Sequence, residues 1–162
     1  MSHESLIGPL SYPAINTTLW SLGSLQRVSL GSPILLVADV VNGALESRYS
    51  ALREPNAAGG YQVTAGKTLW ILKSVHACSA AGGLWLLGSG TADAGDSQVA
   101  APAGAVSEDS RADGISNPYV ATAALTIYEH DLLVAIAATL YPFLRSITPS
   151  NTMRALFIGV EL

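Results

Sequence analysis

Residues 61–79 have the sequence YQVTAGKTLWILKSVHACS, and this stretch decides the fold that we expect. Ala65-Gly66-Lys67 is typical of a turn, and the residues after it are rich in β-branched and aromatic side chains, which favour an extended backbone. We therefore expect a long strand after Lys67. Apolar side chains fall at both odd and even positions, so both faces should be buried. Strict alternation assigns Leu69, Ile71, Val75 and Ala77 to one face and Trp70, Leu72, His76 and Cys78 to the other.

Similar apolar runs between Gly, Pro and Asn turns predict the other strands. Roughly seven to nine short strands at about ten-residue spacing are typical of an antiparallel sandwich. We expect an all-β fold, an antiparallel β-sandwich of jelly-roll type. The other runs that we assign to strands are residues 34–41, 84–87, 119–128, 132–141 and 153–162.

Residues 44–53 fit two interpretations. Asn42-Gly43 is the strongest short signal for a β-hairpin, which would make residues 44–53 the return strand after residues 34–41. Leu45, Tyr49 and Leu52 also have helical spacing, so the sequence leaves a helix open.

Residues 132–140 are apolar throughout and also fit two interpretations. A buried helix could begin at Asp131 as N-cap and stop at Pro142. We prefer a strand, because Glu129-His130-Asp131 resembles a tight turn between Tyr128 and the next apolar run.

The chain divides into an extended N-terminal arm, residues 1–32, and a sandwich domain, residues 33–162. Within the domain, residues 91–118 lack aromatic side chains and predict a long acidic surface loop, with one short strand near Val99. Calcium binding by this loop stays open, although Arg111 and Val120 occupy ligand positions in the only stretch that begins like a calcium loop. The acids of the loop are Asp93, Asp96, Glu108, Asp109 and Asp113.

The composition indicates assembly. Hydrophobic residues make up 49% of the 162 residues and charged residues only 12%, against about 25% charged in an ordinary soluble domain. Much of the apolar excess should therefore face other subunits. The net charge of −4 argues against nucleic acid as a partner, because a DNA-binding surface needs an excess of cations.

We expect no membrane partner and no secretory signal. The longest apolar block without charges, residues 132–144, is shorter than the roughly 20 residues that span a bilayer. The first residues, MSHESLIGPLSYP, lack a basic start followed by an apolar run.

The residues that could carry chemistry are few and scattered. His3, His76 and His130 are far apart in the sequence, whereas a metal site needs three or four convergent ligands. His130 should lie in a solvated turn, and Cys78, the only cysteine, should be a small buried residue. Trp20, Trp70 and Trp85 could stack on sugars, but core packing is the simpler interpretation for the last two.

We therefore expect no enzyme, no catalytic, cofactor-binding or metal-binding residues, and no cofactor. A jelly-roll enzyme of the cupin type would need a His-x-His pair, which the sequence lacks.

Residues 61–69, YQVTAGKTL, resemble a turn that opens a long strand in jelly-roll accessory proteins of tailed bacteriophages, and residues 156–162 are similar to the closing strand of such modules. The resemblance implies a non-enzymatic virion protein, assembled in the host cytoplasm. Its implied role is a capsid decoration or cement protein that forms a homotrimer and contacts the major capsid protein or another virion protein. The alternative is a receptor- or glycan-binding knob of a tail or head fibre. The resemblance assigns no functional residues to this chain.

Overall fold

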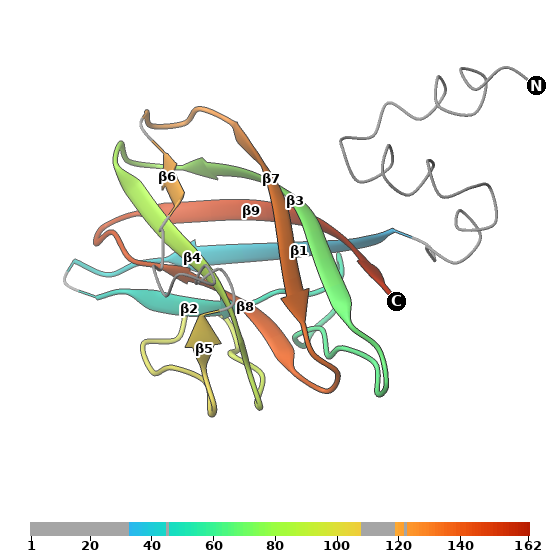
Figure 1. Cartoon of the computed structure of the whole chain (residues 1–162). Helices are drawn as coiled ribbons and strands as arrows, with labels where there is room; N and C mark the ends of the chain where they lie inside the picture. The colour runs from blue at the N-terminus through green and yellow to red at the C-terminus, as the bar shows by residue number, and fades with distance from the viewer. Residues whose placement is uncertain (1–32, 45, 108–118, 122) are drawn as a thin grey trace, which may run out of the picture.

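The computed structural model describes residues 33–44, 46–107, 119–121 and 123–162. The predicted arm, with His3 and Trp20, and the loop acids Glu108, Asp109 and Asp113 therefore lie outside the described residues. The described chain forms strands and no helix (Figure 1). The predicted all-β sandwich is confirmed. The strands are β1 (Ile34–Val41), β2 (Arg48–Ala51), β3 (Leu69–Cys78), β4 (Gly83–Gly90), β5 (Val106–Ser107), β6 (Tyr119–Ala121), β7 (Tyr128–Ile136), β8 (Tyr141–Ser146) and β9 (Thr152–Glu161).

The strands form two antiparallel sheets. The first, which we call sheet A, has the order β1-β9-β3-β7. The second, sheet B, has the order β2-β8-β4, and both β5 and β6 pair with β4. In Figure 1, blue β1 lies beside red β9, although the two strands come from opposite ends of the described chain.

The prediction of a hairpin at Asn42-Gly43 is wrong. The strand interpretation of residues 44–53 is confirmed over the residues of β2. β1 pairs with β9 along its whole length, and β2 pairs with β8 in the other sheet. The Asn42 side chain is buried and donates hydrogen bonds to Ser146 Oγ and to the Thr148 carbonyl oxygen. Its polar groups therefore tie the two sheets together instead of closing a local turn.

The tight turn expected at residues 129–131 is also wrong. β7 runs without interruption through these residues, because Tyr128 and His130 face inward in phase with Leu132. Glu129 and Asp131 are exposed on the other face. The strand interpretation of residues 132–140 is confirmed as far as Ile136, where β7 ends.

A β-bulge in β3 changes the predicted faces of that strand. The pairing register shifts between Ile71 and Lys73, so the alternation slips by one position there. His76 therefore faces the core while Val75 faces outward, and the second half of our assignment to faces is wrong. Trp85 lies fully buried in the core, as expected, but Trp70 is only partly buried on the outer face of sheet A. The side chains that fill the centre of the core with Trp85 include Leu36, Leu69, Ile71, Ile136, Leu144, Met153 and Phe157.

Candidate functional site

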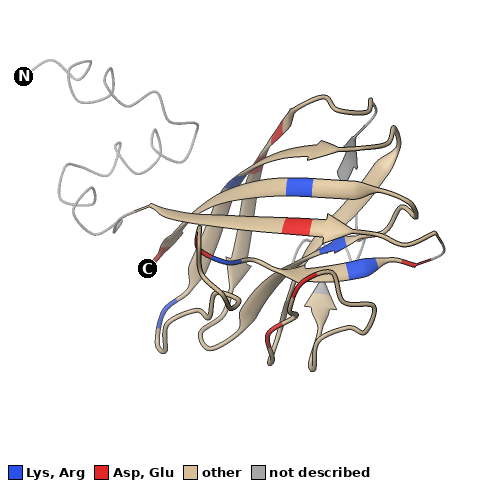
Figure 2. Cartoon of the chain, turned by 180° about the vertical axis from the view of Figure 1, so that it is seen from behind, with Lys and Arg blue, Asp and Glu red and all other residues tan. Residues whose placement is uncertain are grey.

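The outer face of sheet A is a broad apolar surface. Side chains from all four strands contribute to it, and Val37, Leu156 and Val75 lie opposite one another across three neighbouring strands. In Figure 2 the strands of this sheet are mostly tan, with a few red and blue bands. A continuous apolar surface of this kind is typical of a place where another protein binds. Its apolar side chains are Leu35, Val37, Trp70, Leu72, Val75, Leu133, Ala135, Leu156, Ile158 and Val160.

The charged residues on this face form ion pairs between neighbouring strands. Lys73 Nζ lies 2.6 Å from Glu129 Oε2, and Arg154 Nε lies 3.4 Å from Asp39 Oδ1. The hydrogen bond to Glu129 raises the pKa of Lys73, so the ammonium group stays charged. Asp131 is opposite Lys73 in the strand register. These two cations and three acids leave the face with a net charge of about −1.

The two edges of sheet A differ. At one edge, Val37 of β1 exchanges two backbone hydrogen bonds with Arg53, and the Val41 N–H donates to Ser97 Oγ. At the other edge, no strand of the described residues pairs with the free side of β7. Exposed apolar side chains lie on β7 and in the segment before it, since Leu125 is 80%, Ile127 70% and Leu133 65% exposed.

The outer face of sheet B is apolar as well, but the chain itself covers part of it. Ala94 packs on Ala51 and Phe143, and Tyr49 packs against this cluster. The Arg145 guanidinium lies 5.2 Å from the centre of the Tyr49 ring. Beside them is a shallow pocket of about 100 Å³, well below the roughly 300–1,000 Å³ of ordinary small-molecule sites.

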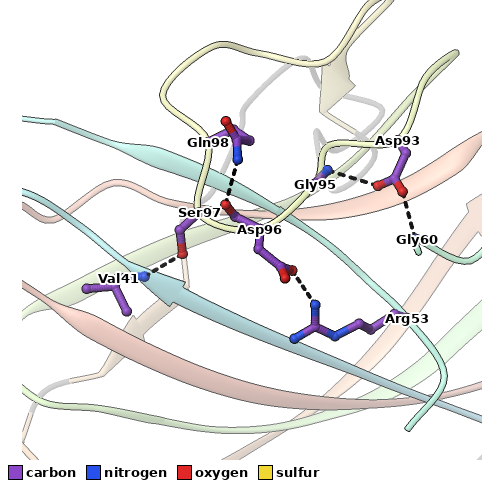
Figure 3. A network of polar contacts seen from close by, with 8 residues as sticks. All are labelled: Val41, Arg53, Gly60, Asp93, Gly95, Asp96, Ser97 and Gln98. Atoms are coloured by element: carbon purple, nitrogen blue, oxygen red, sulfur yellow. Dashed lines mark hydrogen bonds and ion pairs between the residues drawn. The ribbon is translucent and has the colours of Figure 1, made fainter. Parts of the chain in front are cut away.

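Residues 91–98 are held in place by the polar network in Figure 3. The Asp93 carboxylate accepts hydrogen bonds from the backbone N–H groups of Gly60 and Gly95, at 2.8 and 2.9 Å. Asp96 forms an ion pair with Arg53. Two acids of the predicted acidic loop, Asp93 and Asp96, therefore hold residues 91–98 to the sandwich, whereas Glu108, Asp109 and Asp113 lie outside the described residues. The short strand expected near Val99 is reduced to one bridge between Gln98 and Tyr49.

Two histidines meet inside the sandwich. His76 is 1% exposed, and its Nε2 accepts a hydrogen bond of 3.1 Å from Trp85 Nε1. The His130 ring stacks on it with centroids 5.1 Å apart, and Tyr128 stacks at 5.7 Å. The prediction of a solvated turn for His130 is wrong, because register places it beside His76 on the inner face. The sequence carries no local signal for a contact between residues so far apart.

This cluster is built from neutral rings. Burial, and then repulsion from His130, lowers the pKa of His76 to about 4, and burial lowers the pKa of His130. Cys78 is buried on the same strand, and burial raises the pKa of its thiol. Within the described ranges, no group of three or more His, Cys, Asp or Glu residues is placed to hold a metal ion.

No family model matches the chain, and no curated protein and no solved structure matches it either. Among the residues that the structure describes, no helix is long and apolar enough to cross a membrane. The functional assignment therefore depends on the geometry of the sandwich and its surfaces.

Proposed function

We propose that this chain is a non-enzymatic structural protein of a bacteriophage particle, a capsid decoration or cement protein that assembles as a homotrimer. The observation that carries the proposal is the outer face of sheet A, which is apolar, nearly neutral and partly exposed along all four strands. A sandwich with such a face is suited to docking against other proteins. His76 and Cys78 are buried inside the sandwich.

The jelly-roll type of the sandwich is part of the proposal. A jelly roll is a long hairpin of eight strands rolled into two sheets, so the first strand pairs with the last and each inner strand with its counterpart. Without the two-residue β5, the strands pair in this way. The pairs are β1 with β9, β2 with β8, β3 with β7, and β4 with β6.

In this proposal, residues 1–32 attach the chain to the particle by contacting the major capsid protein or another virion protein. The net charge of −4 suits a protein that works close to packaged DNA without binding it. A fibre knob needs a ligand site, and the pocket beside Phe143, in the described part of the chain, is small and shallow.

Purified particles test the proposal. Quantitative mass spectrometry of particles from infected cells should find this chain in a fixed ratio to the major capsid protein, and gold-labelled antibodies should place it on the head. Label confined to the tail tip would favour the knob. Absence of the chain from purified particles would contradict a structural role in the virion.

A further inference from the structure

We propose that the outer face of sheet A is the surface through which identical chains associate, with a second copy of this chain covering it. The inference deepens the proposed function, because it assigns the contact of the proposed homotrimer to named residues. It does not depend on where the assembly sits in a particle.

Size is the first argument. Strands about 4.8 Å apart that rise about 3.3 Å per residue give a four-stranded face of roughly 15 Å by 30 Å, or on the order of 500 Å² in flat projection. The true surface is larger because side chains project from it. A stable interface takes about 800 Å² from each partner, so this face supplies a large part of one subunit contact.

Charge is the second argument. The cations of the face, Lys73 and Arg154, are paired with Glu129 and Asp39 on neighbouring strands. With Asp131, the face has two cations and three acids, so copies of such a surface meet with little net repulsion. A nucleic acid or an anionic membrane would instead require a surplus of cations, which this face lacks. Around a three-fold axis, each copy can bring this nearly neutral, apolar surface against its neighbour.

The edges of the sheet are the third argument. The chain closes the β1 edge through Val37 and Arg53, whereas Leu133 of β7 is 65% exposed and Ile127, just before β7, is 70% exposed. Exposed apolar side chains beside a strand edge that no described strand pairs with favour association with another chain. The second copy should therefore bury the β7 side most completely.

The test compares two exposed positions in the full chain. Leu133→Glu places a charge on the proposed contact, and Val99→Glu, at a residue 52% exposed on the loop before β5, is the matched control. Both side chains lie in solvent in the single chain, so both variants should keep the wild-type circular dichroism spectrum. Native mass spectrometry and light scattering at micromolar concentration should show oligomers for the wild type and Val99→Glu. Leu133→Glu should weaken association by about 100-fold or more.

Thiol labelling provides a second measurement, which does not require a variant that fails to assemble. Cys78 is buried, so a maleimide should report mainly on an introduced cysteine. Leu133→Cys should react slowly in the oligomer and quickly after dilution to monomers, whereas Val99→Cys should react quickly in both.

Three results would overturn the inference. Leu133→Glu could assemble like the wild type. The wild type could be monomeric while Leu133→Glu loses particle occupancy, which would assign the face to another virion protein and leave the proposed function intact. Leu133→Cys could stay protected in dilute monomers, which would mean that residues 1–32 of the same chain cover the face.

Discussion

Both sheets of this sandwich have apolar outer faces, but the described chain covers only one of them. On sheet B, residues 91–98 bring Ala94 onto Ala51 and Phe143, and the cluster is buried within the chain. On sheet A, side chains such as Leu133 and Leu35 remain exposed. The comparison shows that the apolar excess of the sequence lies on two surfaces. A loop of the same chain covers part of the sheet B face, and the sheet A face is available to a partner.

The cover of sheet B is positioned by directed contacts. Backbone hydrogen bonds join Tyr49 to Gln98 and Ala51 to Gly95, along the free edge of β2. The chain thus protects one sheet edge and one apolar face with the same loop, which is a common way to prevent unwanted strand pairing. The β7 edge of sheet A has no such loop among the described residues.

The largest expected effect comes from truncating the covered face. Phe143→Ala removes a ring that is 4% exposed and packs on Ala51 and Ala94, so the free energy of unfolding should fall by about 3 kcal/mol. Leu133→Ala, on the uncovered face, should change the stability of the dilute monomer by less than about 0.5 kcal/mol. Urea denaturation at several protein concentrations measures both. Equal losses at the lowest concentration would break the comparison, because Leu133 would then be packed within the single chain.

The second effect concerns the core behind sheet A, where His76 and His130 are neutral. Both have lowered pKa values in the folded chain because they are buried, so the unfolded chain binds protons first as the pH falls below about 6.5. The free energy of unfolding should therefore decrease with falling pH until His76 itself is protonated near pH 4. The shift of His76 corresponds to a loss of up to about 3 kcal/mol.

His76→Gln is the control for the acid effect. Its side-chain oxygen can still accept the hydrogen bond from Trp85 Nε1, but glutamine does not titrate. The variant should be less stable at neutral pH and should show a flatter stability profile between about pH 7 and pH 5. Equal slopes for the variant and the wild type would show that carboxylates, and not His76, cause the acid sensitivity.

Much of the fold could be predicted from local patterns. β1 coincides with the expected residues 34–41, and β9 lies within one residue of residues 153–162, because runs of β-branched and aromatic residues bounded by turns specify strands locally. The burial of Cys78 and Trp85 followed from the apolar residues around them.

The errors all involve contacts between distant segments. The Asn42-Gly43 signal was overridden because β9, more than a hundred residues later, supplies the partner of β1. The bulge near Leu72 and the stacking of His130 on His76 depend on how β3 pairs with its neighbours. A single sequence does not specify such pairings. The ranges outside the described residues leave the predicted arm and its boundary at residue 32 as predictions.

The smallest expected effect is on the ion pair that helps to hold residues 91–98 over sheet B. It measures how much this pair contributes compared with apolar packing. Asp96 is 61% exposed in its ion pair with Arg53, and exposed pairs contribute about 1 kcal/mol or less. Asp96→Asn should therefore lower the free energy of unfolding only slightly, and the difference should vanish in roughly 0.5 M salt, where surface charges are screened. Asp39→Asn, in the exposed pair with Arg154 on sheet A, is the matched control. If packing of Ala94 and Phe143 holds the loop, both variants should behave alike in urea denaturation. A loss above about 2 kcal/mol for Asp96→Asn alone would mean that the network in Figure 3, and not apolar burial, keeps sheet B covered.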